Sequence, residues 1–231
     1  MQEIDFQDLL IDAWNKFKER WKPLCVASLI GYFLPFLLFM GGYVFVLLSV
    51  MSASRYGQVP EFPMPVLFSL AVLVVVLMLF NVGTENYCMK ICRGDNPTTK
   101  DFFLPFNTYV RLMGAELLCA IAVVIGVAVC FIPGLILGFF FTFVSYAVID
   151  HPELGIMDCI KHSWKLVKQY WKPILILLMI NYAIQSVIGG TVIGLIPAVP
   201  FGILLISLLY TKFNDETAAS SQQQLPPTIQ A

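Results

Sequence analysis

Charged residues are scarce in this sequence. Asp, Glu, Lys and Arg make up 13% of its 231 residues, whereas hydrophobic residues make up 58%. Soluble domains contain about 25% charged and about 45–50% apolar residues, so the composition excludes an ordinary soluble domain. The 14 Lys and Arg residues against 15 Asp and Glu residues leave no basic excess for phosphate groups, so we expect no nucleic-acid partner. Together with a mean hydropathy of +0.80, these shortages predict a membrane protein whose main partners are membrane lipids.

Residues that perform chemistry are also few. The two histidines, His151 and His162, do not form a zinc-binding motif, and no glycine-rich loop resembles a nucleotide-binding cradle. Cys88 and Cys92 have helical spacing, but no further ligand residues flank them, so we interpret them as two small side chains on one helix face. The cysteines do not form the dense framework of a secreted disulfide-bonded domain. The sequence therefore predicts a protein that is not an enzyme, with no catalytic, cofactor-binding or metal-binding residues.

Six apolar stretches approach the length of a membrane-spanning helix, which requires about 20 apolar residues. They cover residues 23–52, 65–88, 110–132, 134–149, 173–193 and 195–210. The sixth contains Pro197 and Pro200 and is either a full span or a broken re-entrant segment; we favour a full span. Residues 1–213 thus form a single transmembrane domain. Residues 214–231 contain too few apolar residues to fold, and we predict a disordered cytosolic tail there.

Basic residues are almost absent from one side of this arrangement. Thirteen of the 14 lie before the first span, between spans two and three, between spans four and five, or after span six, and only Arg55 lies on the other side. Basic loops remain in the cytosol, so we predict that both termini are cytosolic. The first twelve residues hold four acidic residues and no basic residue, so we expect no cleavable signal peptide.

Two segments of the chain, 150 residues apart, are similar. Trp14-Asn-Lys-Phe-Lys-Glu-Arg-Trp-Lys-Pro23 aligns with Trp164-Lys-Leu-Val-Lys-Gln-Tyr-Trp-Lys-Pro173, and seven of 21 positions match across the wider segments. Each segment carries one apolar stripe opposite a charged face, which is typical of an amphipathic helix. A fainter third copy begins at Asp101. We therefore predict an all-α fold of three units, each an amphipathic helix on the cytosolic membrane surface followed by a transmembrane hairpin.

The predicted surface helices contain residues suited to the headgroup layer, where an indole ring is partly wetted and an ammonium group meets anionic lipid. The expected interfacial anchors are Trp14, Trp21, Lys22, Trp164, Trp171 and Lys172. These helices either only orient the hairpins, which is the interpretation that we favour, or also bind a specific lipid or partner.

Polar side chains inside the predicted spans are few, and because an ionisable group in hydrocarbon is costly, each indicates a candidate site. These residues are Asn81, Glu85, Glu116, Asn181 and Gln185. Glu85 is close enough to the cytosolic end of its span to reach headgroup water, and Asn181 and Gln185 are suited to interhelical hydrogen bonds. Glu116 lies deeper. We predict that it faces the bundle interior, with Asn81, Asn181, Gln185 or water as its partner.

Several short motifs resemble those of a known group of proteins. Span two leads into Lys90-Ile-Cys-Arg-Gly-Asp-Asn-Pro97, Ile132-Pro-Gly134 joins spans three and four, and span four ends at Asp150. This pattern resembles bacterial six-span membrane proteins of uncharacterised function that are similar to the membrane domain of some glycerophosphodiester phosphodiesterases. The resemblance implies a six-span fold in a bacterial cytoplasmic membrane. It implies no catalytic residues, because the phosphodiesterase chemistry belongs to a separate soluble domain.

Two functions from different classes fit these observations. The first is a non-catalytic membrane component, which acts as a scaffold, an assembly factor or an organiser of lipid or of a partner. That partner is another membrane protein or a second copy of the chain. The second is a small transporter or channel that uses the intramembrane polar residues. The shortage of catalytic residues and of a charged pathway favours the first.

Overall fold

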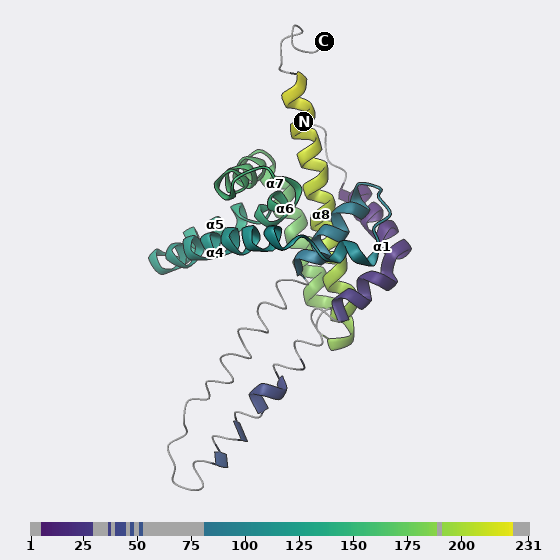
Figure 1. Cartoon of the computed structure of the whole chain (residues 1–231), viewed down its shortest axis with the longest axis vertical. Coiled ribbons are helices and arrows are strands. Elements are labelled where there is room, and N and C mark those ends of the chain that lie inside the picture. Colours follow the sequence, from purple (N-terminus) through teal and green to yellow (C-terminus); the bar gives the residue numbers. More distant parts are fainter. Residues whose placement is uncertain are drawn as a thin grey trace.

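The computed structural model describes residues 6–29, 37, 40–44, 47–48, 51–52, 81–188 and 191–223, and within them it contains helices and no strand. The named elements are α1 (Phe6–Ser28), the 3-10 helix η2 (Thr99–Phe102), α4 (Phe106–Val129), α5 (Phe131–Phe140), α6 (Val144–Asp150), α7 (Ile156–Ile188) and α8 (Val192–Gln223). Residues 81–92 form a further helical segment. The predicted all-α class is therefore confirmed for the described part of the chain (Figure 1).

Four helical stretches are long and apolar enough to cross a membrane. They are Thr99–Val129, Phe131–Asp150, Ile156–Ile188 and Ile196–Ala218. These stretches overlap the last four expected spans. The expected spans at 23–52 and 65–88 are described only in part, at 23–29, 37, 40–44, 47–48 and 51–52 of the first and at 81–88 of the second. By the length and composition of its helices, the chain is a membrane protein.

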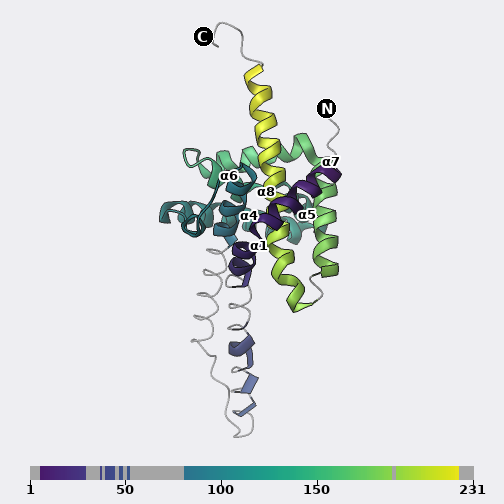
Figure 2. The same ribbon diagram turned by 90° about the vertical axis from the view of Figure 1, so that its right-hand side faces the viewer.

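Two helices, α1 and α7, each contain one residue whose backbone is not helical. Arg20 has φ −123° and ψ 20°, and Tyr170 has φ −118° and ψ 29°. Each lies three residues before a proline inside the helix, Pro23 or Pro173. A proline ring clashes with the carbonyl group four residues earlier and donates no hydrogen bond, so the helix opens just before it. The result is a charged first segment joined to a more apolar second segment at a bend, as Figure 2 shows for α7.

The expected third copy of the surface helix differs from the other two. Before α4 the chain forms only the four-residue helix η2, and α4 continues without a kink. When Asp101 is aligned with Asp158, the position of Pro173 is occupied by Glu116, so no proline opens α4 there. The structure therefore corrects the prediction that an interfacial helix precedes every hairpin.

The fourth expected span is two helices rather than one. A turn of residues 141–143 separates α5 from α6. The turn before α5 also differs from the expected Ile132–Gly134, because the chain leaves helical geometry at Cys130 (φ −164°). Pro133 lies in the first turn of α5, where proline is tolerated because the N–H groups have no helical partner. Gly134 packs against α4 so closely that a Cβ there would lie 2.7 Å from a backbone nitrogen.

The helix α8 is longer than the expected sixth span and runs through both of its internal prolines. Residues 214–223 are helical, which corrects the expected disordered tail, and residues 224–231 lie outside the described part of the chain. Phe213 stacks on Tyr170 of α7, with 4.3 Å between the ring centroids. Asn214 hydrogen-bonds to α6. The helix therefore continues past residue 213 because its side chains contact α6 and α7. The low apolar content of residues 214–223 does not reveal these contacts.

The helix α8 forms the centre of the molecule, with α1 on one side and α4 to α6 on the other (Figure 1). Its side chains Leu205, Leu209 and Tyr210 belong to a buried core that also includes Leu9 of α1 and Leu166 of α7. The helices α4 and α5 lie side by side and extend away from this core (Figure 1). Most large side chains that this pair exposes are apolar, as expected of a surface solvated by lipid.

Candidate functional sites

Two of the predicted intramembrane residues, Glu85 and Glu116, lie close enough for their charges to interact. Glu85 is in the helical segment 81–92, one turn after Asn81, and the charge of Glu116 on α4 acts on its carboxyl group. The Ser145 side chain of α6 also interacts with the Glu85 carboxyl group. The Oε2 atom of Glu85 is buried and has no hydrogen-bond partner among the described residues, which corrects the expectation that this carboxyl reaches headgroup water. Three helices thus bring two carboxyl groups and a hydroxyl group within range of mutual interaction.

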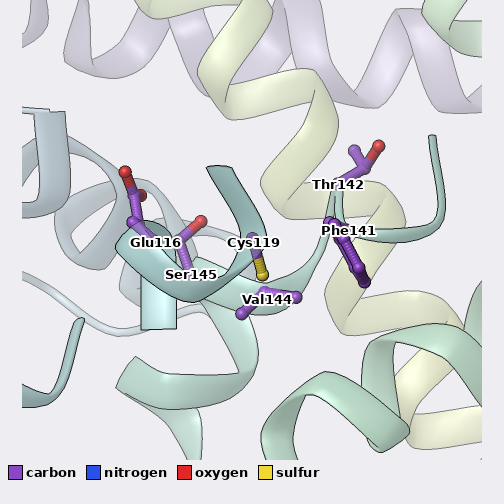
Figure 3. Close-up of a pocket in the computed structure, with 6 residues that line it drawn as sticks. All are labelled: Glu116, Cys119, Phe141, Thr142, Val144 and Ser145. Carbon is purple, nitrogen blue, oxygen red and sulfur yellow. The ribbon is translucent and has the colours of Figure 1, made fainter. Parts of the chain in front are cut away.

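A cavity of about 220 Å³ adjoins this pair (Figure 3). Its polar lining consists of the Glu116 carboxyl, the Cys119 thiol and the hydroxyl groups of Thr142 and Ser145. The first two residues belong to α4, and the other two belong to the α5–α6 turn and to α6. Irregular backbone at membrane depth is tolerated only where protein or a water-filled cavity surrounds it. The interruption of the fourth expected span is therefore part of the cavity wall.

Side chains satisfy the backbone groups that this interruption frees. Thr142 Oγ1 donates to the Phe139 carbonyl at 2.8 Å. Ser163 of α7 donates to the Phe140 carbonyl at 2.8 Å and accepts from the Phe143 N–H at 3.3 Å. Because a buried backbone group without a partner is costly, these three bonds stabilise the turn between α5 and α6.

Asn181 and Gln185 lie at a different place, between α7 and α8. Gln185 Nε2 donates to the Ala198 carbonyl at 2.8 Å, so the expected interhelical hydrogen bond is present for this residue. Both amides face Gly202 of α8 so closely that a Cβ there would lie 2.6 Å from Asn181 Oδ1. The described contacts of both residues are thus with α8, which corrects two of the expected partners of Glu116.

The Trp–Lys pairs that precede the internal prolines have the same indole exposure and similar ring-to-ammonium distances. Trp21 and Trp171 are each 50% exposed. Lys22 Nζ lies 5.9 Å from the Trp21 ring centroid, and Lys172 Nζ lies 5.6 Å from the Trp171 ring centroid. The quadrupole of an indole ring attracts an ammonium group above its face. Each pair therefore presents an apolar ring and a positive charge at one exposed point.

The first tryptophan of each repeat is covered in part by another aromatic ring. Trp14 is 51% exposed and contacts Phe201 of α8 edge-on at 6.0 Å. Trp164 is 39% exposed and stacks on Phe140 of α5 at 4.1 Å. These two expected anchors therefore also pack their segments against other helices.

A polar cluster around Asp150 was not predicted from the sequence. Asp150 ends α6, its side chain is only 8% exposed, and it forms an ion pair with Arg93. Tyr210 Oη and Asn214 Nδ2 of α8 donate to its second oxygen at 3.2 and 3.1 Å. Burial lowers the pKa of Arg93, but the hydrogen bond and charge of Asp150 outweigh this effect, and the pKa is raised overall. These partners lie 57 to 64 residues from Asp150, so the only sequence signal was an acid at the end of an apolar stretch.

Both histidines lie beside this cluster. His162 Nε2 is 3.0 Å from Asn214 Oδ1, and the His151 and His162 rings are 5.3 Å apart. Glu153 approaches His151 Nδ1 at 3.2 Å. A second cavity, of about 260 Å³, has both histidines, Lys165 and Asn214 in its wall. Across the described ranges, no three His, Cys, Asp or Glu side chains are grouped so as to hold a metal ion.

Residues 102–230 match the family described as a domain of unknown function, DUF7847. The match covers more than half of the chain, so the chain belongs to this family. No curated protein and no solved structure matches it. The matched region contains Glu116, Asp150 and the second Trp–Lys–Pro segment, whereas Glu85 and α1 precede it. The two neighbouring carboxyl groups therefore come from inside and outside the matched region.

Proposed function

We propose that this DUF7847 protein is a non-catalytic integral protein of a bacterial cytoplasmic membrane that organises lipid or a membrane partner at the cytosolic surface. In this proposal six spans form three hairpins, and both termini are cytosolic. Four helices of sufficient length and apolar character support the proposal. The distribution of basic residues supports the orientation.

The observation that carries the proposal is the similarity of the two Trp–Lys pairs, each of which lies at a helix bend and is called a Trp–Lys corner below. Trp21 with Lys22 and Trp171 with Lys172 have equal indole exposure and similar ring-to-ammonium distances. Each pair directly precedes a proline associated with a helix bend. An indole beside an ammonium group suits the headgroup layer, where the ring is partly wetted and the charge meets lipid phosphate. Two such corners would hold both bends at one membrane depth.

Fluorescence quenching by lipids that carry a quencher at defined depths tests this placement. Variants that retain only Trp21 or only Trp171 should be quenched most strongly by headgroup-proximal probes. A variant that retains only Trp164 is the matched control, and its stacking on Phe140 should reduce quenching at every depth. Quenching of Trp21 and Trp171 that is strongest at the bilayer centre would contradict the proposal.

Lipid retention tests the organising role directly. Native mass spectrometry of the purified protein should show bound anionic phospholipid, and the Lys22→Ala/Lys172→Ala variant should retain less of it. Lys161→Ala is the matched control, because Lys161 is exposed and pairs with Asp158 of its own helix. Equal retention by all three proteins would argue against lipid binding at the corners.

A second function, a small transporter, is favoured by one specific observation. The interrupted α5–α6 segment borders a cavity that contains Glu116 and adjoins Glu85. Discontinuous helices beside polar groups at membrane depth are typical of transporter binding sites. Proteoliposomes loaded with a pH-sensitive dye should then show solute-dependent flux that the Glu116→Gln variant lacks while remaining folded. The absence of flux with a broad solute panel would argue against this second function and leave the first in place.

A further inference from the structure

We propose that Glu85 and Glu116 form an intramembrane proton-binding site, in which the two carboxyl groups together hold one proton at neutral pH. The proposal concerns the site itself and does not depend on whether the protein organises lipid or moves a solute. It rests on the placement of Glu116 and Ser145 in the wall of one cavity and on the buried Oε2 atom of Glu85, which has no hydrogen-bond partner among the described residues. Glu85 interacts with both of these side chains.

No positive charge among the described residues acts on the pair. The side chains that act on Glu85 are Ser145 and Glu116. The other titratable groups that face the pair are Cys88 on the segment 81–92, Cys119 on α4 and Tyr146 on α6. Thiols and phenols are neutral at neutral pH. Two neighbouring carboxyl groups in a poorly solvated place repel each other when both are ionised, so the pair retains a proton.

The basic residues on the same elements have other partners. Lys90 forms an ion pair with Asp101. Arg111 of α4 donates to carbonyl groups within the 151–154 loop. The nearby titratable group of α7, the buried thiol of Cys159, supplies no positive charge either, and it is directed at the Ala147 carbonyl. Within the described ranges, the counter-ion that would keep both carboxyl groups ionised is therefore absent.

The donors around the cavity suit a proton better than a metal cation. Hard divalent cations take about six or more oxygen ligands, whereas the cavity offers the hydroxyl groups of Thr142 and Ser145 beside the Glu116 carboxyl. The remaining lining is the Cys119 thiol and two apolar side chains. A proton on Glu85 removes the charge from a buried group whose Oε2 has no partner among the described residues. Glu116 is half-buried and lines the cavity, so it is the member that exchanges protons with water there.

Infrared spectroscopy in bilayers of ether-linked lipid tests the site, because such lipids lack ester carbonyl bands. At neutral pH the wild-type protein should show the C=O band of one protonated carboxyl group. This band should shift in D₂O and disappear as the pH is raised. The Glu85→Gln/Glu116→Gln variant should lack the band, whereas Glu19→Gln, which changes an exposed acid of α1, should retain it.

Three results would overturn the proposal. The first is a wild-type spectrum without the band at neutral pH, and the second is a band that persists in the folded double variant. The third is loss of the band when sodium replaces choline at constant pH, because the site would then prefer a metal cation. If the double variant does not fold, the wild-type titration decides, since the band must correspond to one carboxyl group.

Discussion

The repeated segments at 6–24 and 156–174 have the same local structure and different neighbours. Equivalent positions share one buried face: Leu9 and Cys159, Ala13 and Ser163, Phe17 and Val167, and Leu24 and Ile174 are all buried. The non-helical residues, Arg20 and Tyr170, are also equivalent under the 150-residue offset. Residues common to both copies therefore suffice for the helix, its buried face and its bend.

The positions that differ between the copies contact different parts of the molecule. Ser163 stands where the first copy has Ala13, and its hydroxyl group hydrogen-bonds to the interruption between α5 and α6. Tyr170 stands where the first copy has Arg20; the tyrosine stacks on α8, whereas the arginine hydrogen-bonds to Asn96. The comparison teaches that local geometry repeats where the sequence repeats, while tertiary contacts have diverged with the residues that make them.

The largest expected effect tests whether the buried positions are equivalent. Leu24 and Ile174 are both 0% exposed, so Leu24→Ala and Ile174→Ala should each lower the free energy of unfolding by about 2–5 kcal/mol. Leu175→Ala is the control, because this side chain is 44% exposed and its loss should change stability by no more than about 0.5 kcal/mol. Unfolding in mixed micelles with increasing denaturing detergent measures all three. A silent change at only one position of the pair would show that the copies are not equivalent.

An intermediate effect tests where the copies diverge. Ser163→Ala should lower the free energy of unfolding by about 1–3 kcal/mol, because it leaves backbone groups of Phe140 and Phe143 unpaired. The reciprocal change, Ala13→Ser, should cost less, since the new hydroxyl group can bond to the carbonyl of Leu9 one turn earlier. The same detergent titration compares the two variants. Equal costs would argue against a special role of Ser163 at the interruption.

Pro23→Ala and Pro173→Ala should change the free energy of unfolding least among these variants, by no more than about 1 kcal/mol. Each change restores a helical N–H donor, which favours the helix, but it also removes the cause of a bend to which the native packing is adapted. The informative measurement is therefore a distance across the bend. Spin labels at the exposed positions Lys165 and Met179 should lie farther apart in the Pro173→Ala variant as α7 straightens. An unchanged distance would show that the stacking of Tyr170 on α8 holds the bend without the proline.

Part of the candidate site was accessible from the sequence. The sequence indicates Glu116, because a carboxyl group at its expected depth is costly in hydrocarbon. For Glu85 the sequence predicts contact with headgroup water instead, because the Ser145 hydroxyl and the α4 carboxyl that interact with it belong to other helices. The Asp150 cluster is not evident from the sequence for the same reason, since its partners are distant in the chain.

The membrane character, the helical class and the two matching bends follow from the sequence alone. These properties depend on the solvent and on residues within one or two helical turns, such as a proline three positions after the bend. Tertiary contacts are needed to explain the interruption at 141–143, the helical extension past Phe213 and the interaction of Glu85 with Glu116. Each of these requires a hydrogen bond, a stacked ring or a charge supplied by a helix that the local sequence does not contain.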